Sequence, residues 1–339
     1  MFRRLNLIIW PLGLALILLI SACAPAATPT PVPVAVNPTL TPITATPTLM
    51  PTASPTKQST AVPLTLTDGL SHTIQLASPP QRIISLAPSN TEIVFAIGAG
   101  AQLIGREALS DYPAEAAKVT SIGSAYDKLN TEAIVALKPD LILAAEITNP
   151  DQVKTLQGLG LTVYWLPNPK TYDDLFQNIK TVGQITGQID GAQKLIDTLK
   201  IRFAAVIDKV KGAATKPTVF YEVDGTDPTK PWTSGPGTFM DTIITLAGGQ
   251  NVGRVLKDPF GQISSEELIK QNPDIIILGD TLYGVTIDSI SQRAGWKSIA
   301  AVKNKAIYSF DDNLLSRPGP RLIDGLEQMA KLLHPELFK

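Results

Sequence analysis

The sequence predicts an α/β protein with two Rossmann-like lobes, each built on a mainly parallel sheet, and one long helix that bridges them. Short apolar strands alternate with short helices throughout residues 64–339, which is typical of parallel sheets covered by helices. A pattern in the first half of this region recurs in the second half. An amphipathic helix separates the halves, so we expect lobes over 64–187 and 212–339 and a backbone helix over 188–211.

Residues 1–22 have the layout of a secretory signal peptide. Arg3 and Arg4 precede an apolar run over 7–20, and small residues then lead to Cys23, the only cysteine of the chain. This exit resembles the bacterial lipobox, in which the cysteine sulfur is acylated and the chain is cut just before it. We therefore expect a lipid on Cys23. The alternative is a plain N-terminal membrane anchor, for which the apolar run is short.

Residues 23–63 predict a disordered tether. Pro, Thr, Ala, Val and Ser make up most of this segment, and Lys57 is its one charged residue. Such a chain cannot bury enough apolar surface to fold, and its prolines favour extended polyproline II. At about 3.1 Å per residue it would reach on the order of 100 Å when fully extended. We expect a stalk between the lipid and a globular body.

Composition limits what the body can do. The formal net charge is −1 at pH 7, and we expect no nucleic-acid partner. No cysteine follows Cys23, which excludes disulfides and thiol catalysis in the body. His72 and His334 are the only histidines, too few for a His-rich metal site or a Ser-His-Asp triad. We expect a monomer without a metal site.

The N-terminal lobe opens with a predicted hairpin over 64–76, which turns at Asp68 and Gly69. Residues 82–87 predict a buried strand. Residues 88–92 predict the start of the next helix, in which Ser89 and Glu92 have the spacing of a capping box. The remaining elements of this lobe are expected as helices over 131–137 and 151–159 and strands over 140–144 and 162–166.

The second half repeats the first at a distance of 134 residues. Each copy consists of a helix start, a proline that ends the helix, and a strand of β-branched and apolar residues. An aromatic residue precedes each copy at the same offset. The matching segments are 131–134 and 139–143, which correspond to 265–268 and 273–277, with Tyr126 corresponding to Phe260. We infer that the two lobes share one plan.

The predicted backbone helix has apolar residues spaced by three and four, including Leu195, Ile196, Leu199 and Phe203. Its length is roughly 36 Å at 1.5 Å per residue. A single stiff helix is a poor hinge, so we expect small changes in cleft width rather than wide opening.

Aromatic and polar residues occur together in several loops that follow predicted strands. In open α/β sheets, ligands bind beyond the carboxyl ends of the strands, where such loops lie. Loop aromatics offer flat contact area for a large planar or apolar ligand. The alternative for each aromatic is that it caps the core of its own lobe. These loops cover 110–113, 126–127, 230–237, 258–262, 311–313 and 317–321.

These segments, in this order, resemble the substrate-binding lipoproteins and periplasmic proteins of ABC importers for cobalamin and iron-siderophores. The resemblance covers 64–333 and is greatest to the vitamin B12-binding proteins. It is carried by residues 82–92, 110–113, 132–141, 232–235, 265–266 and 317–321.

The resemblance implies a ligand held between the lobes. The chain departs from the family at Ala145, where a tryptophan is expected beside Glu146, and at Tyr126, which replaces another tryptophan. Asn313 competes with Asp312 for the position of the family's acidic residue. The implied ligand-binding residues are Tyr112, Tyr126, Trp232, Phe260, Asp312, Arg317, Ser89 and Asn90.

Glu132 and Glu266 occupy equivalent helix starts in the two lobes. An acidic residue in the first helical turn is stabilised by the helix dipole by ~0.5 kcal/mol, which alone could account for both. The resemblance adds that each glutamate docks onto arginines of the membrane permease. We expect both effects together.

The sequence therefore predicts an extracytoplasmic receptor, not an enzyme. It would be anchored to the outer face of the cell membrane through Cys23, capture cobalamin and deliver it to an ABC permease with its ATPase. Cobalamin is the transported ligand, and we expect no intrinsic cofactor.

Three alternatives stay open. An anionic ferric siderophore would require basic groups in the cleft, for which Arg317 and Arg321 are candidates. Haem would require an axial ligand such as Tyr112 or Tyr126. A surface hydrolase would use loop carboxylates, although loop aspartates more often form turns. The candidate carboxylates are Asp111, Asp127 and Asp311.

Overall fold

The computed structural model describes residues 63–126 and 128–339, which belong to one compact unit. The predicted signal peptide, Cys23 and the tether up to residue 62 lie outside the described residues, as does Asp127. Among the residues described, no helix has the length and apolar character needed to cross a membrane.

The N-terminal lobe has a four-stranded sheet in the order β4-β3-β5-β6, in which all neighbouring strands run parallel. The side chains of Ile83 and Leu141 face α1 and α4, whereas those of Ile84 and Ile142 face α2 and α3. Because both faces are covered, these strands are mostly apolar. The bounds are β3 (Ile83–Ser85), β4 (Leu103–Arg106), β5 (Leu141–Ala145), β6 (Val163–Leu166), α1 (Pro88–Ala96), α2 (Thr131–Ala136), α3 (Pro150–Gly158) and α4 (Tyr172–Thr186).

The C-terminal lobe has a sheet in the order β10-β8-β7-β11-β12, and β9 also pairs with β7. β7, β9, β11 and β12 are parallel, while β8 and β10 form an antiparallel edge. The bounds are β7 (Thr218–Asp224), β8 (Trp232–Ser234), β9 (Gln250–Asn251), β10 (Phe260–Gln262), β11 (Ile275–Leu278), β12 (Ile307–Ser309), α6 (Phe239–Leu246), α7 (Ser265–Gln271), α8 (Ile287–Gln292), α9 (Ala300–Lys303), α10 (Asn313–Ser316) and α11 (Leu322–Leu333).

Short elements complete the described chain. The hairpin β1 (Leu64–Thr67) and β2 (Thr73–Leu76) is antiparallel. Single 3₁₀ turns occupy η1 (Gly100–Gln102), η2 (Ala114–Lys118), η3 (Val252–Val255), η4 (Thr281–Tyr283), η5 (Trp296–Ser298) and η6 (Pro335–Phe338).

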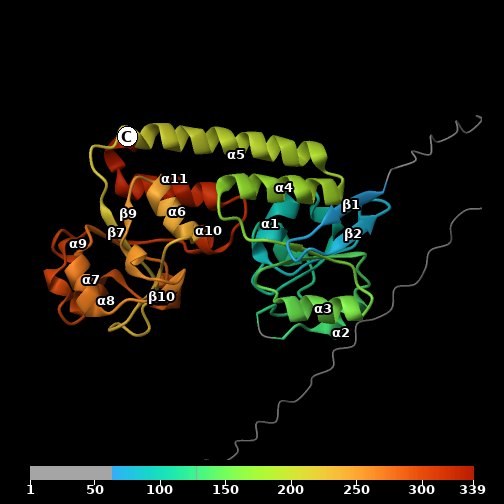
Figure 1. Ribbon diagram of the computed structural model, residues 1–339, viewed down its shortest axis with the longest axis horizontal. Coiled ribbons are helices and arrows are strands. Elements are labelled where there is room, and N and C mark those ends of the chain that lie inside the picture. The colour runs from blue at the N-terminus through green and yellow to red at the C-terminus, as the bar shows by residue number, and fades with distance from the viewer. Residues whose placement is uncertain (1–62, 127) are drawn as a thin grey trace, which may run out of the picture. The chain divides into compact units, whose positions relative to one another are not determined.

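The backbone helix α5 (Ile189–Val210) spans the two lobes along one side of the body (Figure 1). It packs on α4 of the first lobe and α11 of the second, and its buried residues include Ile196, Leu199 and Val206. Arg202 of α5 binds Asp324 and Glu327 of α11 at 2.5 and 2.8 Å. The predicted fold class, two mainly parallel lobes bridged by one long helix, is confirmed.

The repeated segments make equivalent hydrogen bonds in the two lobes. Asn130 and Ser264 accept hydrogen bonds from the third backbone N–H of α2 and α7, at 3.1 and 3.2 Å. Asp140 accepts from the backbone N–H of Arg82 at 2.9 Å, and Asp274 accepts from that of Thr218 at 2.8 Å. Each aspartate thus joins the helix exit to the start of the neighbouring strand.

The helix α1 starts within the predicted segment 88–92, but its predicted capping box is wrong. The helix begins at Pro88, with Ala87 as N-cap and no side-chain cap, so Ser89 and Glu92 form no capping box. Proline is favoured at the first helical position because it has no N–H to satisfy there. Glu92 is buried instead, and its carboxylate binds Arg321 of the other lobe.

Candidate ligand cleft between the lobes

Two adjoining cavities lie between the lobes, with volumes of about 390 and 480 Å³. Glu146 follows β5, Asn168 follows β6, and Asp312 follows β12, so both sheets present their carboxyl ends to the same space. This is where ligands bind in open α/β sheets. The residues that line both cavities are Glu146, Asn168, Asp312, Ser316 and Pro318.

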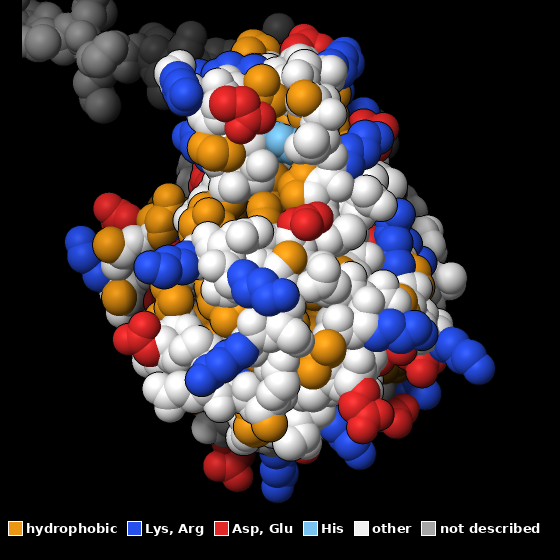
Figure 2. Space-filling model, turned by 90° about the vertical axis from the view of Figure 1, so that its left-hand side faces the viewer, with side chains coloured by type: hydrophobic (Ala, Val, Ile, Leu, Met, Phe, Trp, Pro, Cys, Tyr) orange, Lys and Arg blue, Asp and Glu red, His pale blue; other side chains and the backbone are white. Residues whose placement is uncertain are grey.

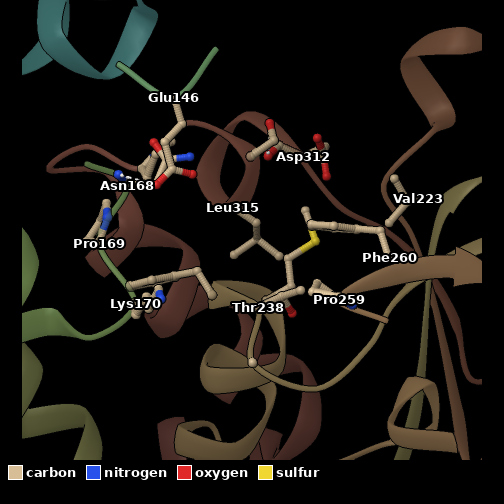
Figure 3. Close-up of a pocket in the computed structure, with 15 residues that line it drawn as sticks. Glu146, Asn168, Pro169, Lys170, Val223, Thr238, Pro259, Phe260, Asp312 and Leu315 are labelled. Carbon is tan, nitrogen blue, oxygen red and sulfur yellow. Dashed lines mark hydrogen bonds between the residues drawn. The ribbon is translucent and has the colours of Figure 1, made fainter. Parts of the chain in front are cut away.

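The first cavity has an apolar wall opposite a polar one (Figure 3). Phe260 and Val223 stand on the side of the C-terminal lobe. Glu146, Asn168 and Lys170 stand across from them. Such a cavity can hold an apolar ring against one wall while polar groups fix its orientation on the other.

The second cavity is lined by exposed aromatic and aliphatic side chains from both lobes. Tyr126 and Leu109 come from the first lobe, and Leu282 and Tyr283 come from the second. Leu282 and Tyr283 are 68% and 85% exposed. Large apolar side chains that gather at an exposed concave surface indicate a binding site.

Burial raises the pKa of Tyr126, and the charges of Glu107 and Asp312 raise it further. The phenol is therefore protonated at neutral pH and can donate a hydrogen bond to a ligand in the second cavity. The same shift disfavours the phenolate form.

Asp312 is held by the hydroxyl group of Tyr221, which donates to its carboxylate at 2.6 Å. Asn313 lines only the second cavity and donates its side-chain amide to Asp311 at 2.9 Å. Asp312 therefore faces both cavities, whereas its rival Asn313 is engaged with its own loop.

Arg317 and Arg321 form ion pairs that join the two lobes. Arg317 lines the second cavity and donates to the carboxylate of Asp111. Arg321 donates to both carboxylate oxygens of Glu92, at 2.6 and 3.0 Å, and its guanidinium lies 4.2 Å from the centre of the Tyr112 ring. Both positive charges are thus balanced by carboxylates of the protein, and the cleft is not a basic pocket.

Comparison with known protein families identifies the family of this chain. Residues 83–314 match the family model described as periplasmic binding protein. The chain belongs to the periplasmic binding protein family.

Among related periplasmic binding proteins is an ABC transporter substrate-binding lipoprotein of Bacillus subtilis, 33% identical over 84% of this chain and 90% of its own. A vitamin B12-binding protein of Pectobacterium atrosepticum is 31% identical over 75% and 88%. The structure of a periplasmic haem-binding protein of Roseiflexus has 26% identity and a TM-score of 0.69, covering 76% of this chain and 99% of that one.

These relatives define a class: substrate-binding proteins of ABC importers for vitamin B12, iron-siderophore or haem. They are binding proteins of transport systems rather than enzymes. The vitamin is a bound ligand in this class, and no intrinsic cofactor is indicated.

The structure brings together five of the eight ligand-binding residues expected for this periplasmic binding protein. Phe260 lines the first cavity, Asp312 lines both, and the second is lined by Tyr126, Ser89 and Arg317.

The other three expected residues lie outside the two cavities. Trp232 is exposed on β8 opposite Gln262 of β10, on the same face of this strand pair as Phe260, so it extends the same wall outward. Tyr112 packs against Arg321. Asn90 is buried, and its side chain donates to the carbonyl oxygen of Ala144 at 3.0 Å.

Sequence reasoning missed several cleft residues. Tyr283 ends η4, the 3₁₀ turn that follows β11, and an aromatic residue shortly after a predicted strand is the signal that could have found it. Lys170 and Asn168 follow β6 in a loop without aromatics. The sequence signals Glu146 only through its position next to Ala145.

Glu132 and Glu266 are exposed in the first turns of α2 and α7. Asn130 and Ser264 supply the caps of these helices, so neither glutamate is needed for capping. Both side chains are available at the surface, one on each lobe. Figure 2 shows the outer end of the C-terminal lobe, where acidic and basic side chains are interspersed rather than gathered by sign.

Proposed function

We propose that this protein is the extracytoplasmic receptor of an ABC importer that binds cobalamin in the cleft between its lobes. The observation that carries the proposal is the pair of adjoining cavities, which combine exposed aromatics with carboxylate, amide and hydroxyl groups. A corrinoid presents a large ring with apolar faces and a rim of carboxamide groups. The similarity to a vitamin B12-binding protein supports this ligand.

Affinity would come chiefly from burial of aromatic surface. Phe260, Tyr126 and Tyr283 are each at least half exposed beside the cavities. Apolar area removed from water contributes about 25 cal/mol per Å². Because these residues approach the cleft from both lobes, a planar ligand could be held from two sides.

Delivery would use the two exposed glutamates. Glu132 on one lobe and Glu266 on the other would contact two similar halves of a permease, which would then widen the cleft and release the ligand with energy from its ATPase. Exposed charges of this kind set orientation and the rate of encounter more than affinity. A lipid on Cys23 would hold the receptor near the permease, and the lipoprotein of Bacillus subtilis supports this anchoring.

A retention experiment tests the ligand. The full chain, purified in detergent, is incubated with an equimolar mixture of cyanocobalamin, haemin and ferrichrome and then desalted. The proposal expects the absorbance spectrum of the retained material to be that of cyanocobalamin. Retention of haemin or ferrichrome alone would reject cobalamin as the ligand and leave the receptor class in place.

Haem is the second candidate. Tyr126 and Tyr283 both line the second cavity and carry the phenol groups that can ligate haem iron. The similarity to a haem-binding structure supports it. Against it stands the raised pKa of Tyr126, because iron ligation favours the phenolate.

A further inference from the structure

Glu146 lies where the two cavities of the cleft adjoin. It is the first residue after β5 and lines both cavities. Its carboxylate accepts a hydrogen bond from the backbone N–H of Asn168, which follows β6, at 3.2 Å (Figure 3). The bond fixes the carboxylate between two strand ends, where a ligand spanning the cavities would touch it.

The charges around Glu146 are unfavourable for an anion. Two carboxylates, Glu146 and Asp312, line the second cavity. Arg317 is the cation among the lining residues of that cavity, and it already binds Asp111. Lys170 enters only the first cavity. A ligand carboxylate placed in the second cavity would therefore meet like charges whose repulsion grows as water leaves the cleft.

The same charges suit a ligand that donates hydrogen bonds. A carboxylate accepts such bonds through two oxygens, and bonds to a charged acceptor are stronger than those between neutral groups. Asp312 and Glu146 face the shared part of the cavities, so amide N–H groups on the rim of a ring would find acceptors there. The carboxylates would otherwise lose hydration without compensation when a ligand enters.

We propose that Glu146 determines ligand specificity: it accepts hydrogen bonds from the carboxamide groups of a corrinoid and excludes ligands that carry carboxylates, such as haem. This inference rests on the proposed function and names the residue that sets the ligand class.

The test compares affinities for two probes, cyanocobalamin and haemin, by isothermal titration of the full chain. Glu146→Gln keeps the shape of the side chain and removes its charge, and Glu146→Lys reverses the charge. Glu115→Gln removes an exposed glutamate of the same lobe outside both cavities and serves as the matched control. Thermal melting confirms that all variants are folded.

We expect Glu146→Gln to weaken cyanocobalamin binding by about tenfold, as the loss of one charge-assisted hydrogen bond implies, and to strengthen haemin binding. Glu146→Lys would shift the ratio of the two affinities further, and Glu115→Gln would leave it unchanged. A ratio that stays within about twofold of the wild type in both Glu146 variants would overturn the inference. Failure of the wild type to bind cyanocobalamin would instead overturn the proposed function.

Discussion

The ion pair between Glu92 and Arg321 joins the two lobes. The two side chains are 3% and 12% exposed, and each carboxylate oxygen accepts one guanidinium N–H. The residues are far apart in sequence, so the pair couples α1 to the segment before α11. Removing one partner would leave the other charge buried without compensation, which is more costly than losing an exposed pair.

We predict that Glu92→Ala lowers the free energy of unfolding by about 3 kcal/mol, because Arg321 would remain buried without a counter-charge. Urea denaturation measures this change. Lys154→Ala, which breaks the exposed pair with Asp151, is the matched control and should cost less than about 0.5 kcal/mol. Equal effects of the two substitutions would contradict the role assigned to the buried pair.

The pH dependence of stability follows from the same residue. Burial raises the pKa of Glu92 above its ordinary value of 4.5, so the folded state holds this proton more tightly than the unfolded state. The contribution of protonated Glu92 to the stability of the folded state is therefore fully present below pH 4.5. It is lost as the pH rises through the raised pKa of the folded state. Burial also raises the pKa values of Glu222 and Asp280, which adds to the trend.

We accordingly expect stability to fall more steeply between pH 4.5 and neutrality in the wild type than in Glu92→Gln. Denaturation with urea at several pH values measures both slopes. Parallel slopes would show that Glu92 does not titrate differently in the two states.

At the scale of elements, α2 and α7 are equivalent helices on the two lobes, each with an exposed glutamate in its first turn. We predict that Glu132→Ala combined with Glu266→Ala abolishes cyanocobalamin uptake by cells that express the protein with its permease, while the affinity for cyanocobalamin stays unchanged. Asp208→Asn on α5 is the control and should leave uptake intact. Normal uptake in the double variant would exclude these helices as docking elements.

Much at this scale could be predicted from the sequence, because periodicity and capping act locally. The repeat correctly indicates that residues around 131 and 265 start equivalent helices, and Asp140 and Asp274 make equivalent hydrogen bonds in the two lobes. The predicted capping box of α1 is wrong because Pro88 is the first helical residue and Glu92 pairs with Arg321, 229 residues away in the sequence. No local sequence pattern predicts an ion pair between such distant residues. Nor does any local pattern predict that Tyr126 and Tyr283 line the same cavity.

At the scale of the molecule, the lobes share a core. One apolar cluster continues from the first lobe through α4, α5 and α11 into the second. Tyr172 of α4 donates to the carbonyl oxygen of Leu322 at 2.9 Å, and its ring contacts Phe203 of α5 and Phe239 of α6. Wide opening would break this packing, so ligand binding should change the separation of the lobes little.

Spin labels test this expectation. In a Cys23→Ser background, labels at Lys154→Cys in α3 and Asp288→Cys in α8 lie on different lobes at exposed positions. We predict that their distance distribution is the same with and without cyanocobalamin, because the shared core resists hinge motion. A clear shift on ligand addition would contradict the rigid arrangement.

Isothermal titration of the full chain with cyanocobalamin tests directly whether this protein binds cobalamin between its lobes, as we propose. We expect tight one-to-one binding that Phe260→Ala weakens by roughly 10- to 50-fold, since half of an aromatic side chain would lose its contact with the ligand. Trp232→Ala should have a smaller effect, because Trp232 lies farther out on the same wall. The absence of binding by the wild type, or wild-type affinity in Phe260→Ala, would contradict the account.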